Sequence, residues 1–234
     1  DEAAARGDVF VIVDAVDDAD LMVIGEACAD RPLLVGGSGI ALGLPKNFID
    51  RGLATGEGAV WRGVDGPEVV LAGSCSRATL GQIARHREGH PSLPLPVDAV
   101  MEGSVTAADI VAFAEAHRGE APLIFSSATP DEVRAAQERH GREAVAHALD
   151  ALFAEAAKAL VAGGVRRLVV AGGETSGAVV SALGLDALAI GPEIDPGVPA
   201  LASTAGDPLV LALKSGNFGA PDFFTKALTK LAGR

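Results

Sequence analysis

Residues 169–180, VVAGGETSGAVV, place three polar side chains between two apolar runs. Glu174, Thr175 and Ser176 stand where a buried strand would pass into a helix, with glycines on both sides. Glycine lets the backbone approach a ligand closely, and the free N–H groups at a helix start suit phosphate. The segment therefore predicts a loop that holds a phosphate ligand, with an ordinary tight connection as the alternative.

Glu174 is the unusual member of this loop, because a carboxylate beside a phosphate repels it unless a cation or a sugar hydroxyl lies between them. Mg²⁺ takes one or two protein carboxylates together with substrate phosphates. Glu174 is therefore expected to contact Mg²⁺, directly or through water, or to bind a ribose. An acid that only stabilises the helix start through the helix dipole is an equal alternative.

Three further loops have a similar composition, namely 36–41 (GGSGIA), 73–79 (GSCSRAT) and 214–219 (KSGNFG). Ligands of open α/β sheets bind beyond the carboxyl ends of the strands, which is where all four loops are expected. A plain turn explains any one of them, but four at one sheet edge favour a nucleotide or phosphate site. Their candidate donors are Ser74, Ser76, Ser215 and Asn217, with Lys214 either as a point charge or as a solvent-facing lysine.

Several other chemistries lack their motifs. Neither the P-loop GxxxxGK[ST] nor the dinucleotide fingerprint GxGxxG occurs, which disfavours a P-loop NTPase and a dehydrogenase. Arg77 stands where the hydrolase elbow GxSxG needs glycine, and Cys75 is expected to be a small buried residue. Glu193 and Asp195 lie in GPEIDPGVP, for which a structural turn is expected and a metal-facing pair is the alternative. The catalytic residue stays unknown.

Strand-like and helix-like runs alternate along the chain and must position these loops. The run 9–16 is expected to be a strand, and 31–45 a strand that enters a glycine turn. This alternation predicts an α/β fold with a mainly parallel sheet and helices on both faces, a Rossmann-like three-layer domain. Residues 46–66 have no period and predict a linker. Helices are expected from Asp17, after the cap residues Thr106 and Thr129, from Arg77, and over 142–161.

Composition narrows the class of protein. The 234 residues carry a net charge of −12 with scattered acids, which argues against a nucleic-acid surface. No apolar run reaches the roughly 18 to 20 residues that cross a bilayer. Cys28 and Cys75 fit a reducing cytoplasm, and the five histidines are expected to be surface or packing residues. The chain begins at Asp1 rather than Met, from which we expect the natural protein to extend further.

Long ordered motifs resemble a known family. VVAGGETSGAVVSALG, IGPEIDPGVP and LALKSGNFG, followed by DFFTKAL, resemble the C-terminal nucleotide-binding domain of the four-carbon acid sugar kinase family, which includes 3-oxo-tetronate kinases. VVLAGSCSRATLGQI looks like the opening of that domain, and VFVIVDAV and GGSGIALGLP look like the end of its substrate-binding domain. By this resemblance, 66–234 is the nucleotide-binding domain, and 1–65 is the end of the substrate domain together with the linker.

The resemblance implies ATP-dependent phosphorylation of the terminal hydroxyl of a four-carbon sugar acid. It places the ATP contacts at Ser74 or Ser76, at the run Gly172, Gly173, Glu174 and Thr175, and at Gly216; substrate contacts are assigned to Gly37, Ser38 and Gly39.

One motif of the family is missing. Its acidic D-D-x-T-G type motif is absent, because VDDAD is followed by Leu21 and Met22. The chain is therefore expected to bind ATP but hardly turn over. A non-catalytic nucleotide- or metabolite-binding module is the alternative. The expected partners are ATP and the sugar acid, with no nucleic acid and no membrane; a homo-oligomer is compatible with the sequence, which does not fix the oligomeric state.

Overall fold

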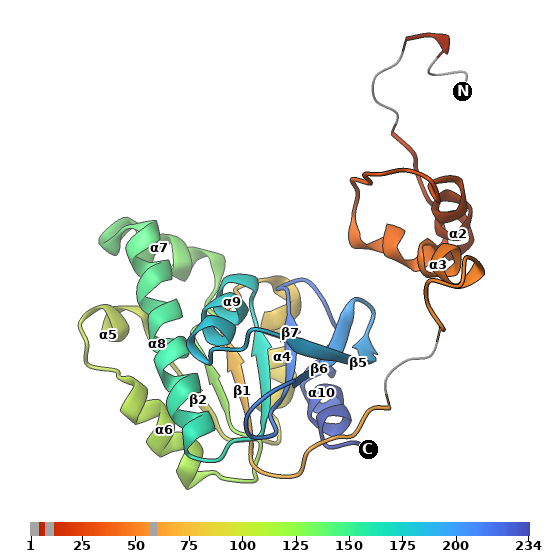
Figure 1. Ribbon diagram of the computed structural model, residues 1–234. Coiled ribbons are helices and arrows are strands. Elements are labelled where there is room, and N and C mark those ends of the chain that lie inside the picture. The colour runs from red at the N-terminus through yellow and green to blue at the C-terminus, as the bar shows by residue number, and fades with distance from the viewer. Residues whose placement is uncertain (1–4, 8–11, 57–59) are drawn as a thin grey trace. The chain divides into compact units, whose positions relative to one another are not determined.

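The computed structural model describes residues 5–7, 12–56 and 60–234 of the chain. By its internal contacts the chain divides into two compact units, Asp1–Gly58 and Ala59–Arg234 (Figure 1). The sequence suggests a boundary after residue 65 between a substrate domain with its linker and a nucleotide-binding domain, and this boundary stays a prediction. None of the helices among the described residues is long and apolar enough to span a membrane.

The second unit is built on one sheet, which has seven strands among the described residues in the order β2-β3-β1-β4-β7-β6-β5. The first five strands of that order run parallel, whereas β6 is antiparallel to both of its neighbours. Every residue of β1 is buried, as is typical of a parallel strand covered on both faces. The strands are β1 (Glu68–Ala72), β2 (Ser92–Pro94), β3 (Leu123–Phe125), β4 (Arg167–Ala171), β5 (Leu188–Asp195), β6 (Val198–Ser203) and β7 (Val210–Lys214).

Helices cover both faces of this sheet (Figure 1). One apolar core joins α6, α8 and α9 to the sheet, and a second core joins α4 and α10 to its other face. The predicted α/β fold with a mainly parallel sheet is therefore confirmed. The helices of this unit are α4 (Arg77–His86), α5 (Val97–Met101), α6 (Ala107–Ala116), α7 (Pro130–His140), α8 (Arg142–Ala162), α9 (Gly173–Ala182) and α10 (Phe223–Leu231).

The turn expected over 191–199 is mostly strand. Strand β5 runs to Asp195 and β6 starts at Val198, so the two form an antiparallel hairpin at the sheet edge. The register between them is irregular at Ile190, Glu193 and Asp195. Prolines are tolerated on such edges and at bulges, because their missing N–H is not needed there. The three prolines of this segment, Pro192, Pro196 and Pro199, therefore mark an irregular edge hairpin rather than a loop.

The first unit contains α2 (Asp18–Ala27), the 3-10 helix η1 (Ser38–Gly43) and α3 (Pro45–Asp50). Asp17 caps α2, as predicted, through a hydrogen bond from the Asp20 N–H to the Asp17 carboxylate at 3.1 Å. The carbonyl and Cα of Gly43 lie where a side chain on Gly25 would be, so the first two helices pack closely. Gly25 and Gly43 are the buried residues among the described residues of this unit.

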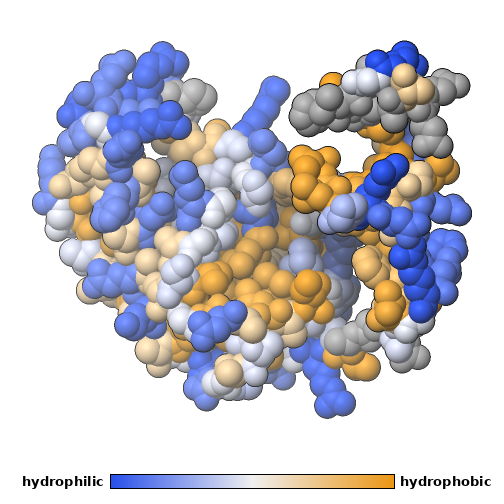
Figure 2. Space-filling view, turned by 45° about the horizontal axis from the view of Figure 1, so that its top comes forward, coloured by the Kyte–Doolittle hydropathy of each residue, from blue (hydrophilic) through white to orange (hydrophobic). Residues whose placement is uncertain are grey.

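The two strands predicted in this unit are not formed where the structure describes them. Residues 9–11 lie outside the described residues, and 12–16 and 31–37 have no strand. A strand needs a hydrogen-bonded partner strand, and the described residues of this unit provide none. Val16 and Val35 are 94% and 91% exposed instead, and Figure 2 shows hydrophobic atoms open on the surface of the unit.

The prediction of a linker over 46–66 is also wrong at both of its ends. Its first residues belong to α3, and its last residues pack on the second unit. There Trp61 Nε1 donates a hydrogen bond to the Lys230 carbonyl oxygen at 2.9 Å, and the Trp61 ring fills the space beside Gly191. The single tryptophan thus fastens the start of the second unit to its last helix and to the β5–β6 edge.

Candidate functional site

Three of the four predicted loops meet at one rim of the sheet. They follow β1, β4 and β7, which are adjacent parallel strands, so their carboxyl ends share one edge. The N–H groups of Gly73 and Ser74 donate to the Ala171 carbonyl oxygen at 2.9 and 3.1 Å, and the Gly172 N–H donates to the Lys214 carbonyl oxygen at 2.9 Å. We call 73–76, 172–175 and 215–217 the rim turns.

The rim turns approach each other so closely that side chains would collide. A Cβ on Gly216 would lie 2.4 Å from Ser74 Oγ. Gly172 has a φ of +138°, a conformation that other residues rarely adopt, and a Cβ there would lie 3.2 Å from the Ser74 N atom. The glycines that suggested a binding loop are thus needed to bring three backbone segments together.

A single carbonyl oxygen, that of Gly216, ties two rim turns together. It accepts hydrogen bonds from Ser76 Oγ at 2.5 Å, from Thr79 Oγ1 at 3.0 Å and from Lys214 Nζ at 2.9 Å. Ser76 also caps α4, since its Oγ accepts from the Thr79 N–H at 3.2 Å. The Ser76 hydroxyl is therefore engaged inside the protein. Ser74 Oγ accepts from the Ser76 N–H at 3.2 Å, so the Ser74 hydroxyl can act toward a ligand as a donor.

Lys214 is neither solvent-facing nor a direct phosphate contact, the two roles considered from the sequence. Its side chain is 1% exposed, so the ammonium cannot reach a ligand at the surface. It donates hydrogen bonds to Thr79 Oγ1 at 2.9 Å, the Ser215 carbonyl oxygen at 3.1 Å and the Gly216 carbonyl oxygen at 2.9 Å. Burial lowers the pKa of Lys214 to about 8, because desolvation disfavours its charged form.

The Lys214 hydrogen bonds fix the direction of two N–H groups. In a trans peptide the C=O of one residue and the N–H of the next point in opposite directions. Since the carbonyls of Ser215 and Gly216 point at the buried ammonium, the N–H groups of Gly216 and Asn217 point away from it, toward the outside of the turn. Two successive outward N–H groups form the kind of concavity that binds anions.

The third rim turn is the first turn of α9. Gly172 is its N-cap and supplies no side-chain bond, so the first N–H groups of the helix keep no intrahelical partner. Gly173 and Glu174 are exposed, whereas Thr175 is buried and its Oγ1 donates to Asp150 Oδ1 at 3.2 Å. Glu174 thus stands at the open side of an uncapped helix start.

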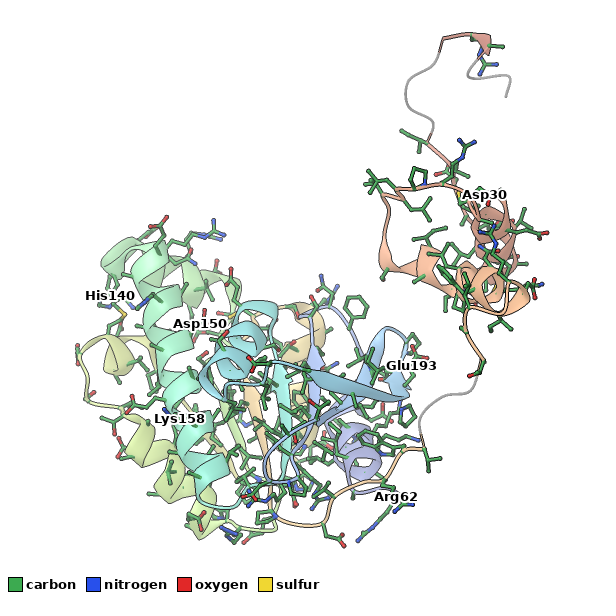
Figure 3. All side chains as sticks on the ribbon, viewed as in Figure 1. Asp30, Arg62, His140, Asp150, Lys158 and Glu193 are labelled. Atoms are coloured by element: carbon green, nitrogen blue, oxygen red, sulfur yellow. The ribbon has the colours of Figure 1, made fainter. Side chains whose placement is uncertain are left out.

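Asp150 on α8 lies beside the start of α9 and was not predicted as a site residue (Figure 3). Burial raises the pKa of its carboxyl, and the nearby charge of Glu174 raises it further. Both carboxylates line one cavity of about 210 Å³. No group of three His, Cys, Asp or Glu side chains that would hold a metal occurs among the described residues. A magnesium ion here would take one or two carboxylates and complete its shell with phosphate and water.

The remaining predicted residues have different surroundings. Ser215 and Asn217 are exposed in their rim turn. Gly37, Ser38 and Gly39 belong to the first unit, at the start of η1, so their loop does not follow a strand.

The acids of GPEIDPGVP have structural partners. Asp195 bonds the Ala220 N–H at 2.8 Å and Lys226 Nζ at 3.0 Å, and Glu193 Oε1 accepts from the Gly197 N–H at 2.7 Å. This pair has the structural role that the sequence favoured.

A further turn lies at the same rim and was missed. Ser126 and Ser127 follow β3, and the Ser126 N–H donates to the Ala72 carbonyl oxygen at 3.0 Å. Ser127 Oγ donates to the Ser74 carbonyl oxygen at 2.6 Å, so this turn touches a rim turn directly. The run of two serines between a strand and the Thr129 cap was the available signal, but the turn contains no glycine.

Comparison with known proteins decides the family. Residues 69–224 match the family model described as nucleotide-binding C-terminal domain. A 3-oxo-tetronate kinase of Cupriavidus necator is 54% identical over 236 residues, which cover 99% of this chain. The chain belongs to the four-carbon acid sugar kinase family. The predicted membership of this family is thereby confirmed.

Further similar proteins agree with this membership. A 3-oxo-tetronate kinase of Pseudomonas savastanoi is 52% identical over 99% of this chain. A crystal structure of a Salmonella typhimurium protein superposes with a TM-score of 0.81, at 35% identity, over 98% of this chain and 54% of that one. A Haemophilus influenzae protein gives a TM-score of 0.77 at 37% identity, over 98% and 55%. The chain spans about half the length of the curated relatives it matches, 54% of each of the two kinases.

Proposed function

We propose that this chain supplies the ATP-binding half of a kinase that phosphorylates the terminal hydroxyl of a four-carbon sugar acid of the 3-oxo-tetronate, threonate or erythronate type. The names of the relatives and the family match to a nucleotide-binding domain support the kinase assignment. The observation that carries the proposal is the meeting of three glycine-bearing turns at the carboxyl ends of β1, β4 and β7.

The triphosphate would bind to backbone N–H groups of the rim turns. The start of α9 offers the N–H groups of Gly173, Glu174 and Thr175, with the positive end of the helix dipole behind them. The opposite turn offers the N–H groups of Gly216 and Asn217, and Ser74 offers its hydroxyl. Phosphoryl transfer depends mainly on positioning and on neutralising charge, and preorganised N–H groups supply both.

Magnesium would lie between the phosphates and Glu174. Glu174 is exposed at the helix start, and Asp150 lines the same cavity, so the two carboxylates can hold the ion directly or through water. Binding of a ribose hydroxyl by Glu174 remains the other role in this proposal. Titrations with and without magnesium distinguish these two roles of Glu174. If Glu174 binds the ion, the effect of its substitution on ATP affinity depends on magnesium; if it binds the ribose, the effect does not.

The substrate would be held by the first unit together with the rest of a substrate domain. The apolar residues of 12–16 and 33–35 are exposed here, which suits strands that pair within a larger sheet. In this arrangement Gly37, Ser38 and Gly39 contribute to the sugar-acid site. The unpaired cysteines Cys28 and Cys75 fit a reaction in the reducing cytoplasm.

The test is a nucleotide titration of the chain followed by an activity assay. MgATP should raise the melting temperature, and Gly173→Val should remove the shift because a branched side chain covers the helix start. Adding the N-terminal half of a full-length relative in trans should then yield phosphorylated sugar acid. ATP binding with no product under these conditions would favour a non-catalytic nucleotide-binding module. No shift with any nucleotide would contradict the proposal.

A further inference from the structure

The ammonium of Lys214 is surrounded in the way that proteins surround a bound monovalent cation. Its three N–H groups donate to Thr79 Oγ1 at 2.9 Å and to the carbonyl oxygens of Ser215 and Gly216 at 3.1 and 2.9 Å. All three acceptors are neutral oxygens. Carbonyl oxygens replace the hydration shell of K⁺ in the same manner. The oxygens around Lys214 therefore have the composition of a site for K⁺ or an ammonium ion.

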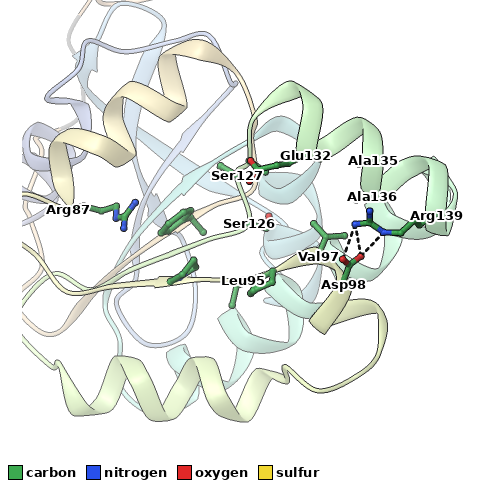
Figure 4. A pocket seen from close by; sticks show the side chains of 14 residues that line it. Arg87, Leu95, Val97, Asp98, Ser126, Ser127, Glu132, Ala135, Ala136 and Arg139 are labelled. Carbon is green, nitrogen blue, oxygen red and sulfur yellow. Dashed lines mark hydrogen bonds and ion pairs between the residues drawn. The ribbon is translucent and has the colours of Figure 1, made fainter.

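The charge of Lys214 has no carboxylate beside it among the described residues. Acids of other elements are engaged elsewhere: Asp195 pairs with Lys226 at 3.0 Å, and Asp98 pairs with Arg139 at 2.8 Å (Figure 4). A fully buried lysine is normally paired, because an uncompensated charge is costly to bury. Burial accordingly lowers the pKa of Lys214, and no acid raises it. An ordinary buried ion pair therefore does not explain this lysine.

The oxygens around the ammonium are also held together without it. Thr79 is fully buried at the start of α4, and its Oγ1 donates to the Gly216 carbonyl oxygen at 3.0 Å. Ser76 Oγ lies 3.1 Å from Thr79 Oγ1 and donates to the same carbonyl oxygen at 2.5 Å. None of these bonds involves Lys214. We therefore expect the oxygens to stay in place when the lysine side chain is removed, and to enclose a space that a free cation can enter.

We propose that Thr79 Oγ1 and the carbonyl oxygens of Ser215 and Gly216 form a monovalent-cation site, which the chain fills with its own lysine. The ammonium holds both carbonyls inward and places a positive charge beneath the outward N–H groups of the turn. In wild type the site is closed to free cations, because the lysine occupies it. The effect on phosphate rests on the proposed function, whereas the cation site does not.

Chemical rescue of Lys214→Ala tests the site. The substitution removes Cγ, Cδ, Cε and Nζ, which the three carbons and the nitrogen of propylammonium replace. Thermal unfolding is measured without nucleotide, in propylammonium chloride and in tetramethylammonium chloride at equal concentration. Tetramethylammonium has the same charge but no N–H donors. At about tenfold its dissociation constant, propylammonium should raise the melting temperature of the variant by about 3 to 6 °C over that in tetramethylammonium. Wild type should melt at the same temperature in both salts.

Two further comparisons separate cation binding from the mere filling of a cavity. Thr79→Val keeps the shape of the side chain and removes Oγ1, so the double variant Lys214→Ala, Thr79→Val should lose most of the rise. 1-Propanol has the length of propylammonium without its charge, and it should give a much smaller rise. Lys158→Ala, on the exposed face of α8, is the matched control and should not respond to propylammonium. An equal rise with 1-propanol would overturn the cation site.

Calorimetric titration with MgATP then tests the connection to phosphate. Lys214→Ala should bind MgATP at least about tenfold more weakly than wild type, and propylammonium should restore the affinity to within about threefold. Restored stability without restored affinity would overturn the connection. Failure of wild type to bind MgATP would overturn the proposed function, while the thermal comparison would still decide the cation site.

The absence of any thermal response in folded Lys214→Ala would overturn the cation site. If this variant does not fold by itself, refolding in propylammonium and in tetramethylammonium replaces the melting experiment. Recovery of folded protein in propylammonium alone would support the proposal, and equal recovery or none in either salt would overturn it.

Discussion

Lys214 Nζ lies 2.9 Å from the carbonyl oxygen of Gly216, beneath a turn whose N–H groups face outward. The contact joins a buried ammonium to the backbone of the predicted phosphate site without any contact between lysine and ligand. Lys214 is therefore a positioning residue in this account. It orients the peptide units of 215–217, and its charge adds to the attraction of the rim for anions.

Lys214→Met should weaken MgATP binding by about tenfold or more, since both the orientation and a nearby positive charge are lost. Isothermal titration measures the change. Lys158→Met removes a lysine from the exposed face of α8 and should leave the affinity unaltered (Figure 3). Equal affinities for wild type and Lys214→Met would show that the turn keeps its form without the ammonium.

The lowered pKa of Lys214 predicts a rise of stability with pH. Between pH 8 and the unfolded pKa near 10.4 the unfolded chain keeps a proton that the folded chain has lost, so the free energy of unfolding increases with pH. The gain is at most about 3 kcal/mol, because one pKa unit is worth 1.36 kcal/mol. Urea unfolding of wild type and Lys214→Met at pH 7.5 and 10 measures it. Between pH 7.5 and pH 10 wild type should gain stability relative to Lys214→Met, and a constant difference between the two proteins would contradict the prediction.

MgATP affinity should follow the opposite course. As pH rises through about 8 the Lys214 ammonium loses its charge, so binding of the triphosphate weakens. The affinity of Lys214→Met should stay flat over the same range. Titrations at pH 7 and 9 compare them, and a wild-type affinity that does not fall would separate the lysine from phosphate binding.

Gly216→Ala should weaken ATP binding. The added Cβ would lie 2.4 Å from Ser74 Oγ and 3.1 Å from Ser76 Cβ, so the Ser74 side chain must turn away and the two rim turns must separate by a few tenths of an ångström, which disturbs the phosphate hydrogen bonds of both. The control is Gly177→Ala in α9, where no atom lies within 4 Å of the new Cβ. That variant should bind ATP normally and gain up to about 1 kcal/mol of stability from helix propensity. Normal binding by Gly216→Ala would place the phosphates elsewhere.

Glu174→Gln should raise the magnesium concentration for half-maximal ATP binding by about tenfold, through loss of one carboxylate ligand. Without magnesium the same variant should bind ATP better than wild type, because a negative charge beside the phosphates is gone. Titrations with and without the ion measure both effects. Glu155→Gln, exposed on α8, serves as the control. An unchanged magnesium requirement would assign Glu174 to the ribose or to the helix start alone.

Replacement of Gln82 should lower the free energy of unfolding. Its side chain is 1% exposed, and Nε2 lies 3.0, 2.9 and 3.1 Å from the carbonyl oxygens of Phe218, Gly219 and Ala220. Gln82→Leu leaves these acceptors unpaired and should cost about 1 to 3 kcal/mol of unfolding free energy. Arg85→Leu on the same helix removes an exposed ion pair and should cost less than about 1 kcal/mol. Similar losses for both would show that water replaces the amide.

Local sequence signals predicted the elements whose formation depends on residues close by in the sequence. The buried run of β1 and the Thr129–Glu132 cap of α7 depend on neighbours a few residues away, and both formed as expected. A strand around Val16 or Val35 needs a hydrogen-bonded partner strand, which hydrophobic periodicity does not reveal, and the described residues of this unit contain none. The β5–β6 hairpin was hidden because its prolines are typical of turns.

The residues of the candidate site were likewise predicted only in part. Glycine and hydroxyl residues at strand ends pointed to three rim turns, since strand ends of a parallel sheet meet at one edge. The sequence did not show that Lys214 is buried, because its side chain is covered by residues of α4 and of the 215–217 turn, distant in the chain. Ser126 was missed because its turn has no glycine.

The central claim is that a triphosphate lies on the rim turns after β1, β4 and β7. A crystal structure of the chain with magnesium and a non-hydrolysable ATP analogue tests it most directly. The account predicts phosphate oxygens within hydrogen-bond distance of the N–H groups of Gly173 and Asn217, with the ion beside Glu174. An analogue bound away from these turns, or a rim that stays empty at saturating analogue, would contradict it.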